Sequence, residues 1–111
     1  MKQLQLTEEQ RLNLAAWCDI MGGDGKELAR QEKIALAAYP PKERLDALKF
    51  KWVDGGQPIW DRDAMFLEGT SVVELEDADA DLLKRKLGSH RFPDGGGRIN
   101  RRWVNPVLEQ L

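Results

Sequence analysis

Hydrophobic and polar positions follow two different periods along the chain, and each period marks one kind of element. Between residues 7 and 21 the apolar positions recur at helical spacing, and Thr7 with Gln10 forms a capping box that begins the helix. Gly22 and Gly23 follow as a helix stop. The side chains predicted to face the core are Leu12, Ala16, Trp17, Ile20 and Met21.

A second helix is predicted to start at once, because Asp24 forms another capping box with Glu27. Pro40 and Pro41 end it, since neither ring can continue the hydrogen-bond ladder. Its predicted buried residues are Leu28, Ala35, Leu36 and Tyr39. The short link makes the two helices an antiparallel or steeply crossed hairpin. Pro41 also fits the first position of a third, short helix that ends near residue 48.

The period changes to two near residue 50, which predicts β-strands. Residues 50–53 and 58–60 flank the sequence Asp54-Gly55-Gly56-Gln57, a combination typical of a β-hairpin. Residues 71–75 form a third short strand. Residues 61–69 fit either one or two helical turns or a loop. Their apolar triplet of Met65, Phe66 and Leu67 belongs either to the core or to an exposed docking element.

Charged residues mark both ends of a further helix. Asp77 suits the N-cap, and carboxylates in the following turn complement the positive end of the helix dipole. Three cations, residues 84–86, occupy the last turn, and Gly88 follows as the stop. The packed face is predicted to hold Ala78, Leu82, Leu83 and Leu87.

The C-terminal part divides into a loop and a helical segment. Residues 88–97 hold four of the ten glycines together with Pro93, which predicts a flexible Gly-rich loop. Residues 98–111 form the helical segment, and its apolar residues recur every four positions at Ile99, Trp103, Val107 and Leu111. Pro106 interrupts this stripe, so we expect a kink or two short helices.

These elements define an α+β fold class. We expect residues 1–111 to form a single domain, in which the helical hairpin packs on a small, mainly antiparallel sheet with a following helix. Large aromatic side chains bury much area, so the four tryptophans, Trp17, Trp52, Trp60 and Trp103, are predicted to belong to the core and the sheet.

Net charge and cysteine content limit the partners and the cellular compartment that we expect for this chain. The net charge of −2 disfavours a protein whose main role is non-specific nucleic-acid binding. The single cysteine, Cys18, cannot form an intramolecular disulfide, which favours a reducing compartment. The sequence contains neither a signal-peptide pattern nor an apolar run long enough to span a bilayer. We therefore expect a cytoplasmic protein without a membrane partner.

The sequence predicts no catalytic residue, metal site or cofactor. The Asp77-x-Asp79-x-Asp81 run begins like a calcium loop, but its sixth position is Leu82 and its twelfth is Gly88. Cys18 is expected in or near the core and His90 in a solvated loop, so they do not form a nucleophilic pair. The glycines of residues 95–97 lack the P-loop pattern.

Charge is distributed unevenly over the second half of the chain. Residues 68–81 hold six acidic residues and no Lys or Arg, whereas residues 84–102 hold seven Lys or Arg and one acidic residue. The candidate partner-binding residues are His90, Arg91, Phe92, Arg98, Arg101, Arg102 and Trp103. A secondary acidic patch comprises Glu74, Glu76, Asp77, Asp79 and Asp81. The alternative interpretation is an ordinary solvated surface, since the whole chain is acidic.

Three stretches of the chain carry a resemblance to a known group of proteins. They are Leu6-Thr7-x-x-x-Arg11-x-x-Leu14, Gly55-Gly56-Gln57-x-x-Trp60-Asp61, and Val72-Val73-Glu74-Leu75 before the acid-started helix. Their order resembles that of small proteins of unassigned function encoded by phages and prophages, over residues 6–87. Such proteins are often accessory factors that bind host or phage proteins, and the resemblance implies no catalytic residue.

We therefore expect a non-enzymatic protein-binding accessory or inhibitor protein. If it is phage-encoded, it acts on a host or phage protein in the host cytoplasm. One alternative is a nucleic-acid-binding protein that uses the Arg-rich C-terminal segment, with affinity that falls steeply with salt. Another is an oligomeric virion or assembly component, which would be a homo-oligomer with aromatic area at its contact.

Overall fold

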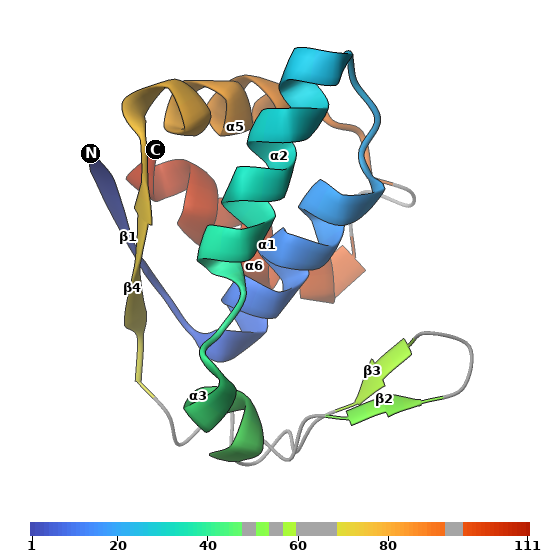
Figure 1. The fold of residues 1–111 in the computed structure, drawn as a ribbon, viewed down its shortest axis with the longest axis vertical. Helices are drawn as coiled ribbons and strands as arrows, with labels where there is room; N and C mark the ends of the chain where they lie inside the picture. The colour runs from blue at the N-terminus through green and yellow to red at the C-terminus, as the bar shows by residue number, and fades with distance from the viewer. Residues whose placement is uncertain (48–50, 54–56, 60–68, 93–96) are drawn as a thin grey trace.

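Two antiparallel strand pairs and five helices make up the part of the chain that the computed structural model describes (Figure 1). The described residues are 1–47, 51–53, 57–59, 69–92 and 97–111. In chain order the elements are β1 (Lys2–Leu6), α1 (Glu8–Ile20), α2 (Gly25–Ala38), α3 (Lys42–Ala47), β2 (Lys51–Val53), β3 (Gln57–Ile59), β4 (Ser71–Leu75), α5 (Asp77–Ser89) and α6 (Gly97–Gln110). The predicted α+β fold class is confirmed.

The sheet that supports the core pairs the N-terminal strand β1 with β4, and the sequence pattern did not predict β1. The pairing is antiparallel and places Leu4 opposite Val73. Both strands alternate buried and exposed residues, so the leucines and Val73 point inward while Gln3, Val72 and Glu74 lie on the solvated face. The side chains of Gln3 and Glu74 are hydrogen-bonded across the strands at 3.1 Å.

The free edge of β1 is covered by the end of α6. The side-chain amide of Gln110 accepts a hydrogen bond from the N–H of Gln5 at 2.6 Å and donates one to its carbonyl at 3.0 Å. This amide therefore pairs with the backbone N–H and carbonyl of Gln5 on the edge strand, as a neighbouring strand would.

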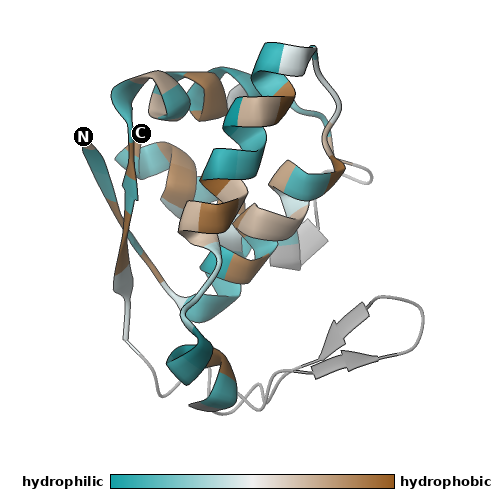
Figure 2. Ribbon diagram, viewed as in Figure 1, coloured by the Kyte–Doolittle hydropathy of each residue, from teal (hydrophilic) through white to brown (hydrophobic). Residues whose placement is uncertain are grey.

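The helices cover one face of the β1–β4 sheet and enclose the core (Figures 1 and 2). α1 and α2 pack against each other, α6 lies against α1 and β1, and α5 contacts α2 and α6. Two of the four tryptophans, Trp17 and Trp103, are buried in this core as predicted. The side chains of Trp52 and Trp60 lie outside the described residues. The β1–β4 sheet itself carries no aromatic residue. The tryptophans predicted to belong to the sheet therefore do not lie on these two strands.

The buried faces of α1 and α2 differ in part from the prediction. In α1, Leu12 and Trp17 are buried and Met21 is half-buried as expected, but Ala16 and Ile20 are exposed. Glu8, Arg11, Leu14, Ala15 and Cys18 take the inward positions instead. In α2 only Ala35 of the predicted set is buried, and Leu28, Leu36 and Tyr39 are exposed. The inward side chains of α2 are Gln31, Ile34, Ala35 and Ala38.

These differences have a common physical reason. Most of the inward polar groups have hydrogen-bond partners from distant segments, which offsets the cost of burying them. The amide of Gln31, for example, donates to the carbonyls of Cys18 at 3.4 Å and of Met21 at 2.8 Å, and so joins α2 to the end of α1.

The ends of the helices agree closely with the capping pattern, with α5 as the exception. Both predicted capping boxes, at Thr7 and Asp24, are present. The N-cap of α5 is Glu76 rather than Asp77, and the helix continues past Gly88 to Ser89. Its packed face contains Leu82, Leu83 and Leu87 as predicted, but Ala78 is exposed while Asp79 and Ala80 are buried.

α6 is a single helix that contains Pro106, so of the two predicted alternatives, a kink or two short helices, the second is wrong. Its predicted apolar stripe is confirmed at Trp103 and Val107, which are buried, and at Leu111, which packs against the core. The side chain of Ile99 lies outside the described residues. Gly97 is the first residue of α6, so the predicted loop of residues 88–97 is shorter at both ends.

The predicted β-hairpin is confirmed as a sheet of its own. β2 and β3 pair antiparallel, with Trp52 opposite Pro58. Residues 61–68, with Met65, Phe66 and Leu67, lie outside the described residues. α3 begins directly after Pro41, whose carbonyl accepts the first hydrogen bonds of the helix from Arg44 and Leu45.

Candidate interaction surfaces

The aromatic members of the predicted partner-binding segment pack against other aromatic rings, with Trp103 buried and His90 and Phe92 half-buried. The ring centroid of His90 is 5.6 Å from that of Trp17 and 4.5 Å from that of Phe92, both in edge-to-face geometry. Trp103 is 6.2 Å from both Trp17 and Phe92. The exposed fraction of Trp103 is only 2%. Trp103 is therefore a core residue, and His90 is a half-buried neighbour of aromatic rings rather than a solvated loop residue.

The arginines of the same segment differ in their surroundings. Arg91 and Arg101 are exposed. Arg102 forms an ion pair with Glu9 of α1, which joins the two helices. The side chain of Arg98 lies outside the described residues. All three of the described arginines of the segment are therefore exposed, and Arg102 also has a structural contact with α1.

Three carboxylates of the predicted acidic patch form ion pairs with other parts of the chain. Asp79 is 2% exposed, and its carboxylate contacts Arg30 of α2 at 2.9 Å and Lys33 at 3.5 Å. Glu76 contacts the same Lys33 at 3.0 Å, and Asp77 lies 3.5 Å from the amino group of Met1. These carboxylates stabilise contacts with α2 and the N-terminus.

The remaining acidic residues of that patch do not converge on a common point. Glu74 is hydrogen-bonded to Gln3 on the solvated face of the sheet, whereas Asp81 is exposed on α5. Within the described residues there is no group of three or more His, Cys, Asp or Glu residues that could hold a metal ion.

A buried polar cluster at the start of α1 was not found by sequence reasoning. The guanidinium of Arg11 donates to the carbonyls of Ala37, Ala38 and Tyr39 at 3.3, 2.9 and 3.2 Å, and so caps the C-terminal end of α2. It also donates to the hydroxyl of Ser71 in β4 at 2.7 Å. Burial lowers the pKa of Arg11, the nearby carboxylate of Glu8 opposes this shift, and Arg44 adds to it.

Glu8 completes this cluster. One carboxylate oxygen, Oε1, contacts Arg44 at 3.1 Å and accepts from the hydroxyl of Ser71 at 3.4 Å. The other, Oε2, is buried without a hydrogen-bond partner in the part of the chain that the structure describes. The sequence shows Glu8 only as an acidic first-turn residue, which is why its role in joining α1, α3 and β4 was missed.

Cys18 is a core residue, as predicted. Burial, followed by the nearby charge of Asp19, raises the pKa of its thiol to about 12, although Lys86 acts in the opposite direction. The thiol is therefore protonated at neutral pH, and thiols in this form are poor nucleophiles.

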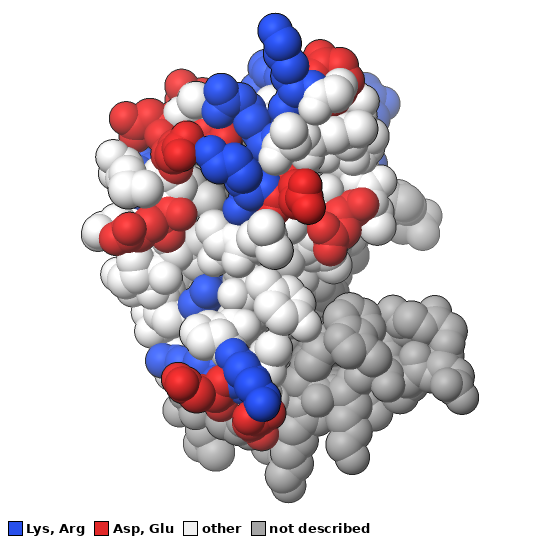
Figure 3. Space-filling view, in the orientation of Figure 1, with Lys and Arg blue, Asp and Glu red and all other residues white. Residues whose placement is uncertain are grey.

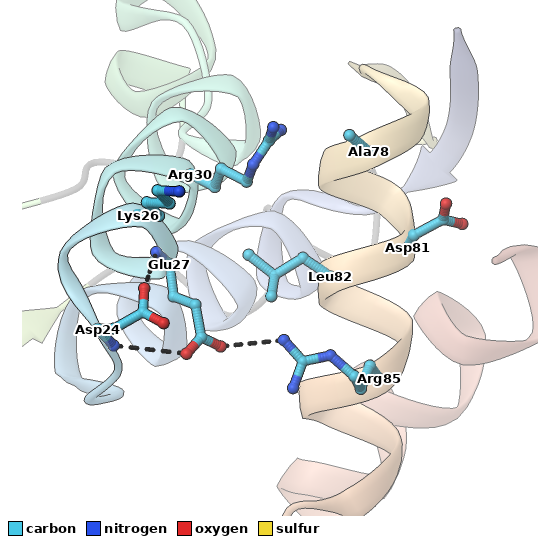
Figure 4. Close-up of a pocket in the computed structure, with 8 residues that line it drawn as sticks. All are labelled: Asp24, Lys26, Glu27, Arg30, Ala78, Asp81, Leu82 and Arg85. Atoms are coloured by element: carbon cyan, nitrogen blue, oxygen red, sulfur yellow. Dashed lines mark hydrogen bonds and ion pairs between the residues drawn. The ribbon is translucent and has the colours of Figure 1, made fainter.

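A polar groove separates α2 from α5 (Figure 4). Its lining residues are Asp24, Lys26, Glu27, Arg30, Ala78, Asp81, Leu82 and Arg85. Glu27 contacts Arg85 at 3.0 Å across the groove and also belongs to the capping box of Asp24. These contacts lower the pKa of Glu27, with the hydrogen bond from Arg85 as the largest cause. The charges of the groove thus largely neutralise each other.

Three exposed large apolar side chains belong to α1 and α2, and none of them lines the polar groove. The exposed fraction is 79% for Ile20, 71% for Leu36 and 47% for Leu28. The surface that we call the α1–α2 face comprises Ala16, Asp19 and Ile20 of α1 with Leu28, Glu32 and Leu36 of α2, all of which are exposed. In Figure 3 carboxylates lie over the α1 side of this region, whereas Lys and Arg side chains lie over the upper part of α2 and toward α5.

Comparison of the chain with models of protein families, with curated proteins and with solved structures yields no match. Among the helices in the described ranges, none combines the length and the apolar character needed to cross a membrane. The functional conclusion therefore depends on the surfaces described above.

Proposed function

We propose that this chain is a non-enzymatic protein-binding accessory or inhibitor and that it binds its partner through the α1–α2 face. The observation that supports this is the high exposure of Ile20 and Leu36 on neighbouring helices. Single exposed apolar residues are common on protein surfaces, but several of them gathered in one patch are typical of an interaction site.

The proposal includes a phage or prophage origin and action in the host cytoplasm. Its support is the resemblance of residues 6–87 to small phage and prophage proteins, many of which bind host or phage proteins. The binding surface proposed here differs from the one that the sequence suggested, because His90, Phe92 and Trp103 pack against one another and Trp103 is buried.

The test is capture of partners by the tagged full-length chain from lysate of its native host, with and without nuclease treatment, followed by mass spectrometry. We expect a stoichiometric protein partner that survives nuclease treatment and is lost with the double substitution Ile20→Ser/Leu36→Ser. The matched control is Val72→Ser, which removes an exposed apolar side chain from the outer face of β4. A partner that the double variant still binds would contradict the proposed surface.

A nucleic-acid-binding function is the second candidate, and the exposure of Arg91 and Arg101 favours it. If these side chains contact phosphates, the logarithm of the association constant for DNA or RNA should fall linearly with log salt concentration, and the slope should be shallower in Arg91→Ala/Arg101→Ala. Loss of every captured species on nuclease treatment would favour this function over protein binding.

A further inference from the structure

We infer that the α1–α2 face binds a basic amphipathic helix of the partner protein, an inference that rests on the proposed protein-binding function. Two features of the face lead to it: the apolar side chains form two rows along neighbouring helices, and the charges among them are acidic.

The geometry of the two rows follows from helical spacing and from the packing of α1 on α2. Leu28, Glu32 and Leu36 are four residues apart and therefore share one stripe of α2, as Ala16 and Ile20 do on α1. Hydrogen bonds between the helices fix them side by side and antiparallel: Arg11 near the start of α1 binds the last residues of α2, and Gln31 binds the last turn of α1.

Such a pair of rows favours a helical ligand. An amphipathic helix presents apolar side chains at i, i+3, i+4 and i+7 along one stripe, and such a stripe can lie along these two rows. An extended strand would instead pair with a sheet edge, whereas the rows of this face lie on two helices.

The charges of the face determine which charge a ligand should carry. Asp19 and Glu32 are exposed and have no ion pair within the described residues. The cations of α2, in contrast, lie on its other side, where Arg30 and Lys33 contact the buried Asp79 of α5. A ligand whose apolar stripe is flanked by Lys or Arg would therefore bring cations next to unpaired carboxylates.

The same charges disfavour the other occupants. A second copy of the chain bound through this face would bring acidic residues against acidic residues. A nucleic-acid backbone would meet the same repulsion. A basic helix is the occupant that satisfies both the apolar rows and the carboxylates.

The probe is a synthetic amphipathic peptide of Leu and Lys, about 18 residues long so that it forms a helix when bound. The comparison peptide has Glu in place of every Lys. Both carry a fluorophore, and their binding to the full-length protein is measured by fluorescence anisotropy. We expect the Lys peptide to bind about ten-fold more tightly than the Glu peptide at low salt.

Charge reversal provides the decisive variant. Asp19→Lys/Glu32→Lys should reverse the preference, so that the Glu peptide binds more tightly. The matched control Asp81→Lys/Glu109→Lys makes the same change in net charge at exposed positions on α5 and α6 and should keep the wild-type preference. Circular dichroism of each variant should show an unchanged fold, because the four positions are exposed.

Several outcomes would overturn the inference. Equal affinity for the two peptides would do so, as would an equal effect of the control and the charge reversal. Self-association in sedimentation experiments that Ile20→Ser/Leu36→Ser removes would assign the face to a second copy. If that variant abolishes partner capture but the Lys peptide is not preferred, the inference fails while the proposed function stands.

Discussion

The side-chain amide of Gln10 donates a hydrogen bond to the carbonyl oxygen of Arg102 at 3.1 Å. In an uninterrupted helix this carbonyl would accept from the N–H four residues later, but that residue is Pro106, which has no N–H. The oxygen Oε1 of Gln10 also accepts from the N–H of Thr7 at 2.9 Å. One side chain thus completes the start of α1 and compensates for the missing bond in α6.

This relationship predicts coupling between Gln10 and Pro106. Gln10→Glu keeps the capping acceptor but removes the donor, so it should lower the free energy of unfolding by about 1 kcal/mol. In a Pro106→Ala background the new N–H serves the Arg102 carbonyl, and the same substitution should cost much less. A double-mutant cycle by urea unfolding measures this coupling. An equal cost in both backgrounds would show that the carbonyl is not involved.

Arg11 should be one of the residues on which stability depends most. Arg11→Ala removes the cap on the last carbonyls of α2 and leaves the buried Glu8 with less positive charge around it. We expect a loss of about 3 kcal/mol in the free energy of unfolding. Arg101→Ala, at an exposed position, is the control and should stay within about 0.5 kcal/mol of wild type. A loss below about 1 kcal/mol for Arg11→Ala would contradict this role.

The effect of the buried Asp79 carboxylate on stability should depend on whether its cationic partners, Arg30 and Lys33, are present. In the wild type, Asp79→Asn weakens the contacts with Arg30 and Lys33 and should cost about 1 kcal/mol, since both cations are partly solvated. In an Arg30→Ala/Lys33→Ala background the carboxylate is buried without these cations, so Asp79→Asn should stabilise the fold. Asp81→Asn, at an exposed position of the same helix, is the control for unfolding measurements. Destabilisation in both backgrounds would rule out the ion pairs as the cause.

Cys18 should make stability fall at high pH. Its folded-state pKa of about 12 lies above the ordinary value of 9.0, so the unfolded chain loses its thiol proton first as the pH rises. The contribution is complete below pH 9 and is lost as the pH rises from there through 12, by up to about 1.4 kcal/mol per pH unit. Unfolding of wild type and Cys18→Ala over this range measures it, and the variant should show the weaker pH dependence. Parallel pH profiles would refute the assignment.

The two glycines in the turn between α1 and α2 should differ in how well they tolerate a side chain. A Cβ on Gly23 would lie 2.7 Å from Nζ of Lys86, whereas one on Gly22 would meet nothing within 4 Å. Lys86 cannot yield freely, because its Nζ donates to the carbonyl of Gly22 at 2.6 Å and to the Oε1 of Gln31 at 2.7 Å. Gly23→Ala should therefore cost about 1 kcal/mol, while Gly22→Ala should be neutral or slightly stabilising. Thermal unfolding of both variants compares them directly, and equal melting temperatures would contradict the Lys86 contact.

Local patterns in the sequence were enough for most of the elements. The capping boxes at Thr7 and Asp24, the stop at Pro40 and the strand over residues 71–75 each depend on neighbouring residues alone, and each is present. Strand β1 was missed, although Lys2–Leu6 alternates, because so short a segment becomes a strand only through its pairing with β4.

The sequence by itself determined where this chain forms helices and turns, because capping and backbone geometry act over a few residues. The tertiary structure alone decided which faces are buried. Arg11, Gln31 and Asp79 lie inside because residues from distant elements provide their hydrogen bonds and counter-charges. Ile20 and Leu36 lie outside because those polar side chains orient α1 and α2, and so only the assembled fold places the proposed binding face on the surface.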